Sequence, residues 1–231
     1  MNLTRIARLT GVAYLGLAVT GALTFLAVRN QLSVAGDSAA TLDNLTQQSG
    51  LAQIGLVLEL LVVITQALAA LGFFALFRHD RPAAAFGVAA FGVANAIAIL
   101  MSVAFNATAL AVVADSSLAP AGDSAATVGL LYALSGACWS VGNIFFGLWL
   151  IPMGWFVIST RRMPLVLGWV LVVGGVGYVL SALIGAGLPE LAATTNAVLP
   201  VAASVGEFWI IGYLLIRGIR PAVTSSTPIA T

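Results

Sequence analysis

The sequence Ala203–Gly218 (ASVGEFWIIGYLLIRG) is an apolar run that holds one carboxylate, Glu207. A run of this kind predicts a helix that crosses a membrane, because a helix satisfies all its backbone groups within the segment. A charged side chain at mid-bilayer costs roughly 2.5–3.5 kcal/mol on insertion scales. We therefore expect Glu207 to face protein or a polar cavity and not lipid.

Two upstream patterns resemble Val205-Gly206-Glu207. Val141-Gly142-Asn143 matches it closely, and Val57-Leu58-Glu59 matches it loosely. Both lie inside other apolar runs, at depths similar to that of Glu207. The sequence therefore predicts an intramembrane polar cluster, which consists of Glu59, Asn143 and Glu207.

The composition excludes an ordinary soluble domain. Hydrophobic residues make up 61% of the 231 residues and charged residues only 7%, whereas soluble domains carry about 25% charged residues. The net charge of +1 gives no electrostatic reason to expect nucleic acid as a partner. The lipid bilayer is the partner that this composition predicts, and protein partners stay open.

Six apolar segments are long enough to cross about 30 Å of hydrocarbon. The sequence thus predicts an all-α polytopic membrane protein, a bundle of six transmembrane helices in one domain, residues 1–220. Residues 221–231 are expected to be a disordered cytoplasmic tail. The approximate limits of the segments are 7–28, 51–77, 83–114, 127–158, 164–186 and 195–216.

The arginines predict the orientation. Eight of the nine fall in the connections on one side of the predicted bundle, and only Arg29 falls on the other. Because cytoplasmic loops are enriched in basic residues, both termini are expected to be cytoplasmic. The eight are Arg5, Arg8, Arg78, Arg81, Arg161, Arg162, Arg217 and Arg220.

The heptapeptide AGDSAAT occurs twice in the predicted outer loops, at 35–41 and at 121–127. A looser copy, AGLPELAAT, occupies 186–194. One interpretation is three parallel helical hairpins, in which Glu59, Asn143 and Glu207 are equivalent. A duplication of the first outer loop alone also explains the heptapeptide, and both interpretations stay open.

The run Asn143–Leu183, and within it Phe146–Gly154 (FGLWLIPMG), carries a family resemblance. Together with Ala7–Leu15 and Gly206-Glu207, it resembles the bacterial membrane family of domain of unknown function 4386. The resemblance implies a six-helix, multi-pass protein of the bacterial plasma membrane. It brings no activity, substrate or catalytic residue.

The motifs of intramembrane enzymes are missing from the sequence. It has no paired aspartates, Ser with His or His-Glu zinc helix within its spans, no P-loop, and no His/Cys cluster for zinc or haem. We therefore expect no catalytic, cofactor-binding or metal-binding residue, no cofactor, and no enzymatic activity. A non-catalytic sensor, accessory or structural role in the membrane is the favoured function.

The alternative function is a small proton-linked carrier that uses Glu59 and Glu207. Burial disfavours the ionised carboxylate, so each residue could exchange a proton, and the ligand would be a proton or a small molecule. No arginine is expected inside the spans to pair with them, so Asn143 and nearby polar groups are the expected hydrogen-bond partners. Each Glu→Gln change is then expected to alter stability by less than about 1 kcal/mol.

Small residues should let helices approach closely, and Gly174 and Gly177 are expected to lie against another helix.

Overall fold

The computed structural model describes residues 2–199 and 201–221, and these residues form helices and turns without a strand. The expected all-helical, multi-pass architecture is confirmed, with five helices long and apolar enough to span a membrane. A shorter apolar helix, α9 (Val201–Ile216), has 16 residues. Of the expected tail at 221–231, residues 222–231 lie outside the described residues. The five long helices are α1 with its extensions (Leu3–Leu32), α4 (Ser49–Phe77), α5 (Pro82–Ala114), α6 (Ser124–Thr160) and α7 (Leu165–Gly187).

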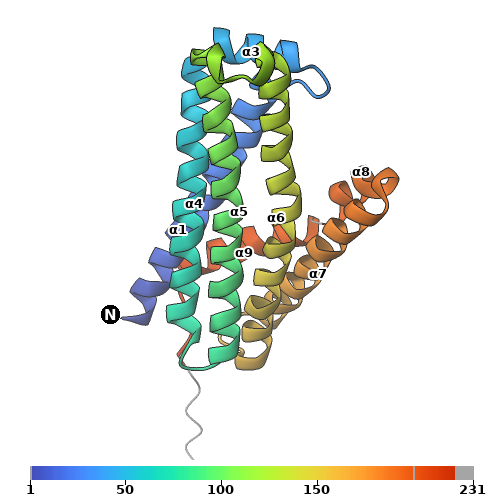
Figure 1. Ribbon diagram of the computed structural model, residues 1–231. Coiled ribbons are helices and arrows are strands. Elements are labelled where there is room, and N and C mark those ends of the chain that lie inside the picture. Colours follow the sequence, from blue (N-terminus) through green and yellow to red (C-terminus); the bar gives the residue numbers. More distant parts are fainter. Residues whose placement is uncertain (1, 200, 222–231) are drawn as a thin grey trace, which may run out of the picture.

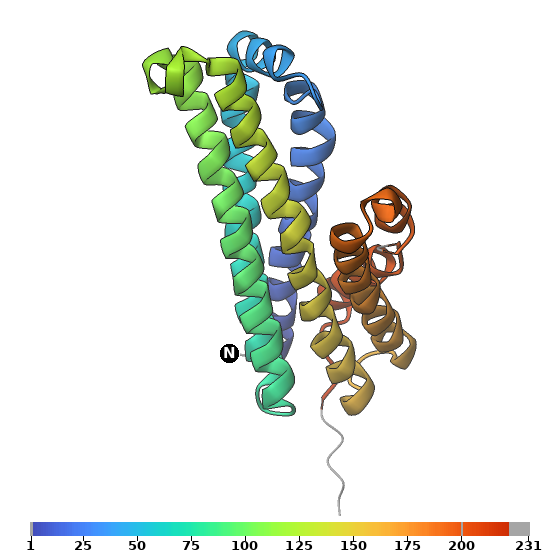
Figure 2. The same cartoon turned by 45° about the vertical axis from the view of Figure 1, so that its right-hand side comes forward.

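The three long helices α4, α5 and α6 pack side by side, and α1 packs against α4 (Figures 1 and 2). Helix α7 packs on the lower half of α6 and leans away from the bundle. Helix α9 lies between α7 and α1 and contacts both. The apolar core is centred on Trp149, Phe73 and Tyr14, all at most 2% exposed.

One end of the bundle gathers the N-terminus, the α4–α5 turn and the α6–α7 turn (Figure 1). The C-terminal segment is attached to the same end. The Arg162 side chain forms an ion pair with Asp80 and donates to the Arg220 carbonyl at 2.7 Å, and the Arg220 amide donates to the Arg162 carbonyl at 3.2 Å. The segments that carry eight of the arginines therefore meet at one end.

The two AGDSAAT copies, at the opposite end, build the same helix start. In each copy the glycine has a positive φ, +77° at Gly36 and +75° at Gly122, which suits a residue without a Cβ. The aspartate that follows caps the helix: Asp37 accepts from the Ala40 amide and Asp123 from the Ala126 amide, both at 2.9 Å. The repeated sequence is thus a capping turn.

The helices that these caps open are different. The first cap opens the short helix α3 (Ser38–Gln47), which precedes α4, and the second opens α6 directly. The looser third copy runs into the short helix α8 (Pro189–Val198), which begins with a proline and has no side-chain cap. Also at this end, hydrogen bonds from the Ser117 side chain and from the Ser117 backbone amide hold the pKa of the Asp115 carboxyl below its usual value.

Glycines bring α6 and α7 into close antiparallel contact. A Cβ added at Gly147 would lie 2.5 Å from the Gly175 carbonyl oxygen, and one at Gly154 would lie 2.5 Å from that of Gly168. The predicted packing of Gly174 and Gly177 is also confirmed. A Cβ at Gly177 would lie 2.5 Å from the Leu199 carbonyl oxygen, and one at Gly174 would overlap the Ala203 backbone.

Candidate functional site

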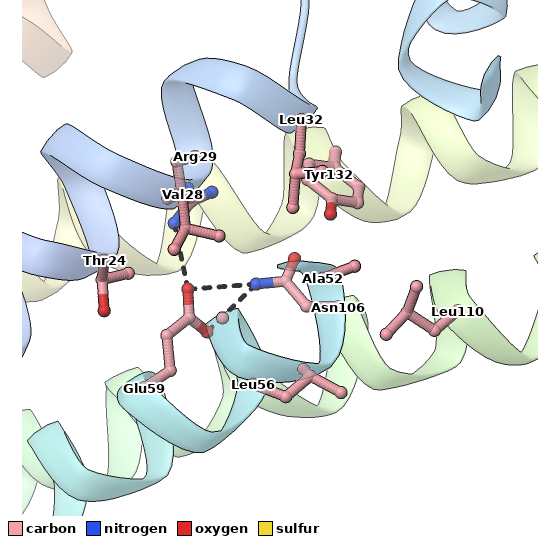
Figure 3. A pocket seen from close by; sticks show the side chains of 11 residues that line it. Thr24, Val28, Arg29, Leu32, Ala52, Leu56, Glu59, Asn106, Leu110 and Tyr132 are labelled. Carbon is pink, nitrogen blue, oxygen red and sulfur yellow. Dashed lines mark hydrogen bonds and ion pairs between the residues drawn. The ribbon is translucent and has the colours of Figure 1, made fainter. Parts of the chain in front are cut away.

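Glu59 lies in a closed polar cluster between η1 (Thr24–Arg29, a π-helical extension of α1), α4 and α5 (Figure 3). Its side chain is almost completely buried, with a residue exposure of 2%. The Asn106 amide donates to both carboxylate oxygens, at 3.1 and 3.0 Å. A guanidinium nitrogen of Arg29 lies 3.6 Å from Oε1 of Glu59. The carboxylate thus has both a hydrogen-bond donor and a counter-charge.

The expectation that no arginine pairs with Glu59 is therefore wrong. The sequence placed Arg29 beyond the end of the first span at residue 28, but the helix continues through η1 and α2 (Asn30–Leu32). Arg29 consequently stays on the helix and faces Glu59. Its position directly after the apolar run was the available signal, because arginines near helix ends have long stems that reach to neighbouring polar groups.

Two serines and an aromatic ring complete the surroundings of Arg29. Its second terminal nitrogen donates to the Ser135 hydroxyl at 3.0 Å, and Ser135 shares a 2.7 Å hydrogen bond with Ser102. Its guanidinium carbon lies 5.4 Å from the Phe25 ring centroid. The cavity at Glu59 measures about 20 Å³, which is room for about one water. The geometry is that of a fixed ion pair.

Glu207 has different surroundings. The Tyr14 hydroxyl donates to its Oε1 at 2.7 Å, and Tyr14 is held by edge-to-face contacts with Phe73 and Trp149, with ring centroids 5.7 and 5.1 Å apart. The carboxylate is half-buried and lines a cavity of about 320 Å³ between α1, α6, α7 and α9. None of the described residues that line this cavity is basic.

Asn143 lines a neighbouring cavity of about 500 Å³, together with Phe25 and Arg29. This cavity shares Trp139, Phe146 and Tyr178 with the cavity at Glu207, and shares Arg29 with the small cavity at Glu59. The partners of the two glutamates are Asn106 and Tyr14, in place of the expected Asn143.

The three residues of the predicted polar cluster do not lie together in the structure. Glu59, Asn143 and Glu207 line three successive cavities, and the two glutamates do not share one. Sequence reasoning missed Tyr14 as a partner, although Gly-Val-Ala-Tyr at 11–14 has a close counterpart, Gly-Val-Gly-Tyr, at 175–178. Asn106 was not singled out either, since nothing in the sequence shows that Asn106 on α5 faces Glu59 on α4.

Two further buried amides have no hydrogen-bond partner within the described part of the chain. Gln66 on α4 is 0% exposed and Asn95 on α5 is 1% exposed. Neither residue lines one of the three cavities described above.

Comparison with known proteins gives one match. The family described as "Domain of unknown function (DUF4386)" matches residues 9–218. The match confirms the resemblance read from Ala7–Leu15, Asn143–Leu183 and Gly206-Glu207. No curated protein and no solved structure matches the chain.

Proposed function

This chain belongs to the family of the domain of unknown function DUF4386, and we propose that it is a non-catalytic protein of the bacterial plasma membrane that binds a small ligand beside Glu207. A single observation carries the proposal. Glu207 faces a cavity of about 320 Å³, which falls in the range of small-molecule sites, about 300–1,000 Å³. A carboxylate with only a structural role would be enclosed, as Glu59 is.

Six spans with both termini in the cytoplasm are part of this proposal. Two features support the six spans and the cytoplasmic termini. The segments that carry eight arginines lie at one end of the bundle, and the chain returns to that end after α9, where the Arg162 side chain donates to the Arg220 carbonyl. Helix α9, with 16 residues, is about 24 Å long at 1.5 Å per residue. It would cross a locally thinned bilayer or end within its interface.

The topology can be tested with reporter fusions. Fusions at Asp43, Asp123 and Glu190 should score periplasmic, and fusions at Arg81 and Arg162 should score cytoplasmic. The physical reason is the concentration of arginine in the connections that stay inside. A cytoplasmic signal at Asp123 would break the proposed topology.

The same orientation places Glu59 near the outer boundary of the bilayer. Eighteen residues separate it from Phe77 at the inner end of α4, which is about 27 Å along the helix. The hydrocarbon core is about 30 Å thick. An arginine at this depth can extend its charged head toward the interface, which supports a structural role for the pair of Arg29 and Glu59.

Cysteine accessibility tests the ligand cavity. In a Cys138→Ser background, Ala18→Cys places a thiol on the cavity wall, whereas Val19→Cys places one on the outer side of the same helix, where Val19 is 48% exposed. Thiols react as thiolates, which form in water and not in lipid. A small uncharged methanethiosulfonate should modify Ala18→Cys at least about ten times faster than Val19→Cys.

Equal, slow modification of both thiols would show that water does not reach the cavity, and the proposed ligand site would be lost. Both variants should first be shown to be monodisperse in detergent. Both positions lie on α1, so the comparison holds the helix and its packing constant.

A proton-linked carrier is the second candidate, and the same cavity favours it. In this version Glu207, without Glu59, exchanges the proton, because Glu59 is enclosed and paired with Arg29. Proteoliposomes that contain a pH-sensitive dye separate the two candidates. We expect no proton flux above that of protein-free vesicles. Flux that Glu207→Gln abolishes would establish the carrier and replace the proposed function.

A further inference from the structure

We propose that the cavity beside Glu207 takes a monovalent organic cation with an apolar body. This inference rests on the proposed function, since it names the chemical class of the ligand. It follows from the charge balance of the helical interior, from the aromatic lining of the cavity, and from the scarcity of oxygen ligands within it.

The first argument is charge balance. The charged residues in the two polar sites are Arg29, Glu59 and Glu207. Arg29 compensates Glu59 at 3.6 Å, whereas Tyr14, the partner of Glu207, is a neutral donor. An ionised carboxylate among largely apolar walls is costly without a counter-charge, even where some water reaches it. Either a proton or a bound cation can supply the missing positive charge at Glu207.

The second argument is the lining. Tyr14, Trp139, Phe146, Tyr178 and Phe208 line the cavity with Glu207. The faces of aromatic rings attract cations, and aromatic cages with a carboxylate suit organic ammonium groups. The remaining wall is aliphatic, with Leu17, Val62 and Ile211 among its residues. A ligand with a charged centre and an apolar body would satisfy both parts of the wall.

Arg29 does not oppose this assignment. It lines the neighbouring cavity and not the cavity at Glu207, and Glu59 compensates its charge. The neighbouring cavity of about 500 Å³ shares three aromatic residues with the first.

A metal ion fits the site less well. Calcium takes six to eight oxygen ligands, and structural zinc takes four nitrogen or sulfur ligands. The cavity offers one carboxylate and a few hydroxyls, those of Tyr14, Tyr178 and Ser204. Within the described ranges no group of three or more His, Cys, Asp or Glu residues could hold a metal.

Two probes of the same shape and opposite charge test the proposal. Radiolabelled tetraphenylphosphonium and tetraphenylborate are equilibrated with the purified full chain in nanodiscs, and empty nanodiscs correct for partition into lipid. We expect saturable binding of the phosphonium cation and none of the borate anion. Glu207→Gln keeps the shape and the hydrogen-bonding capacity of the side chain but removes its charge, and should weaken cation binding by roughly tenfold or more.

Glu190→Gln is the matched control. It removes the same charge from an exposed position in the first turn of α8, and cation binding should stay unchanged. Three results would overturn the proposal: no binding of the cation to the wild type, equal binding to Glu207→Gln, or equal binding of the anion. If the thiol of Ala18→Cys is reactive but the cation does not bind, the cavity stands as a ligand site and only the assigned ligand class fails.

Discussion

Gly154→Ala lowers the free energy of unfolding by about 1–3 kcal/mol, the usual cost of forcing an extra methyl group into a packed interface. The new Cβ would lie 2.5 Å from the Gly168 carbonyl oxygen. That neighbour is backbone, which cannot rotate away as a flexible side chain could. Helices α6 and α7 would have to separate, and the contact of Gly147 with Gly175 would loosen with them.

Gly136→Ala is the matched control, since Gly136 lies on the same helix and has nothing within 4 Å of the added Cβ. Alanine favours a helix over glycine by about 1 kcal/mol, so this variant should be as stable as the wild type or more stable. SDS titration in mixed micelles measures both free energies. If Gly154→Ala is as stable as Gly136→Ala, the close approach of α6 and α7 is wrong.

Arg29→Met lowers the free energy of unfolding by about 3 kcal/mol. The change leaves Glu59 buried without its counter-charge, and breaking a buried ion pair from one side costs about 3–5 kcal/mol. We expect the lower end of this range because the Arg29 side chain is still 15% exposed, whereas that of Glu59 is only 3% exposed. Most of this loss of stability arises because the Glu59 carboxylate stays buried without a counter-charge, and less of it from the lost attraction between Arg29 and Glu59.

The double variant Arg29→Met/Glu59→Leu tests that reason. Apolar residues that replace both members of a buried pair are often as stable as the pair itself. The double variant should therefore recover most of the loss, apart from the cost of leaving the Asn106 amide without its acceptor. If the two single losses simply add, Arg29 and Glu59 do not interact, and the geometry of Figure 3 is wrong.

The sequence alone predicted the features that depend on local physics. Apolar runs set the helices, because insertion into a membrane is decided by each segment's own composition. The glycines at 174 and 177 could be placed against a neighbour, because small residues in a span mark close approach. The capping role of AGDSAAT is equally local, with glycine and aspartate in the positions that a helix start favours. It was not predicted, because the repeat was read only as three equivalent hairpins or as a duplicated outer loop.

The partners of the polar residues could not be predicted in the same way. Tyr14 meets Glu207 across 193 positions of sequence, and Asn106 meets Glu59 across 47. Such pairs depend on the rotation of each helix about its own axis, which composition leaves undefined. Arg29 was missed for a related reason, since the expected span ended one residue before it and the π-helical extension η1 carried it inward.

We propose that the two glutamates have different roles: Glu59 stabilises the bundle, and Glu207 binds a ligand. From the sequence, both Glu→Gln changes were expected to alter stability by less than about 1 kcal/mol. For Glu207 we still expect this small change, because a glutamine at this position can accept the hydrogen bond from Tyr14. For Glu59 we now expect a larger loss, because glutamine leaves Arg29 without a counter-charge.

The free energies of unfolding of Glu59→Gln and Glu207→Gln, measured side by side by SDS titration, distinguish the two roles. We expect a loss of about 2–3 kcal/mol for Glu59→Gln and of less than about 1 kcal/mol for Glu207→Gln. Equal losses, or a larger loss for Glu207→Gln, would contradict this proposal, because Glu207 would then be the structural carboxylate and the cavity beside it would have no separate role.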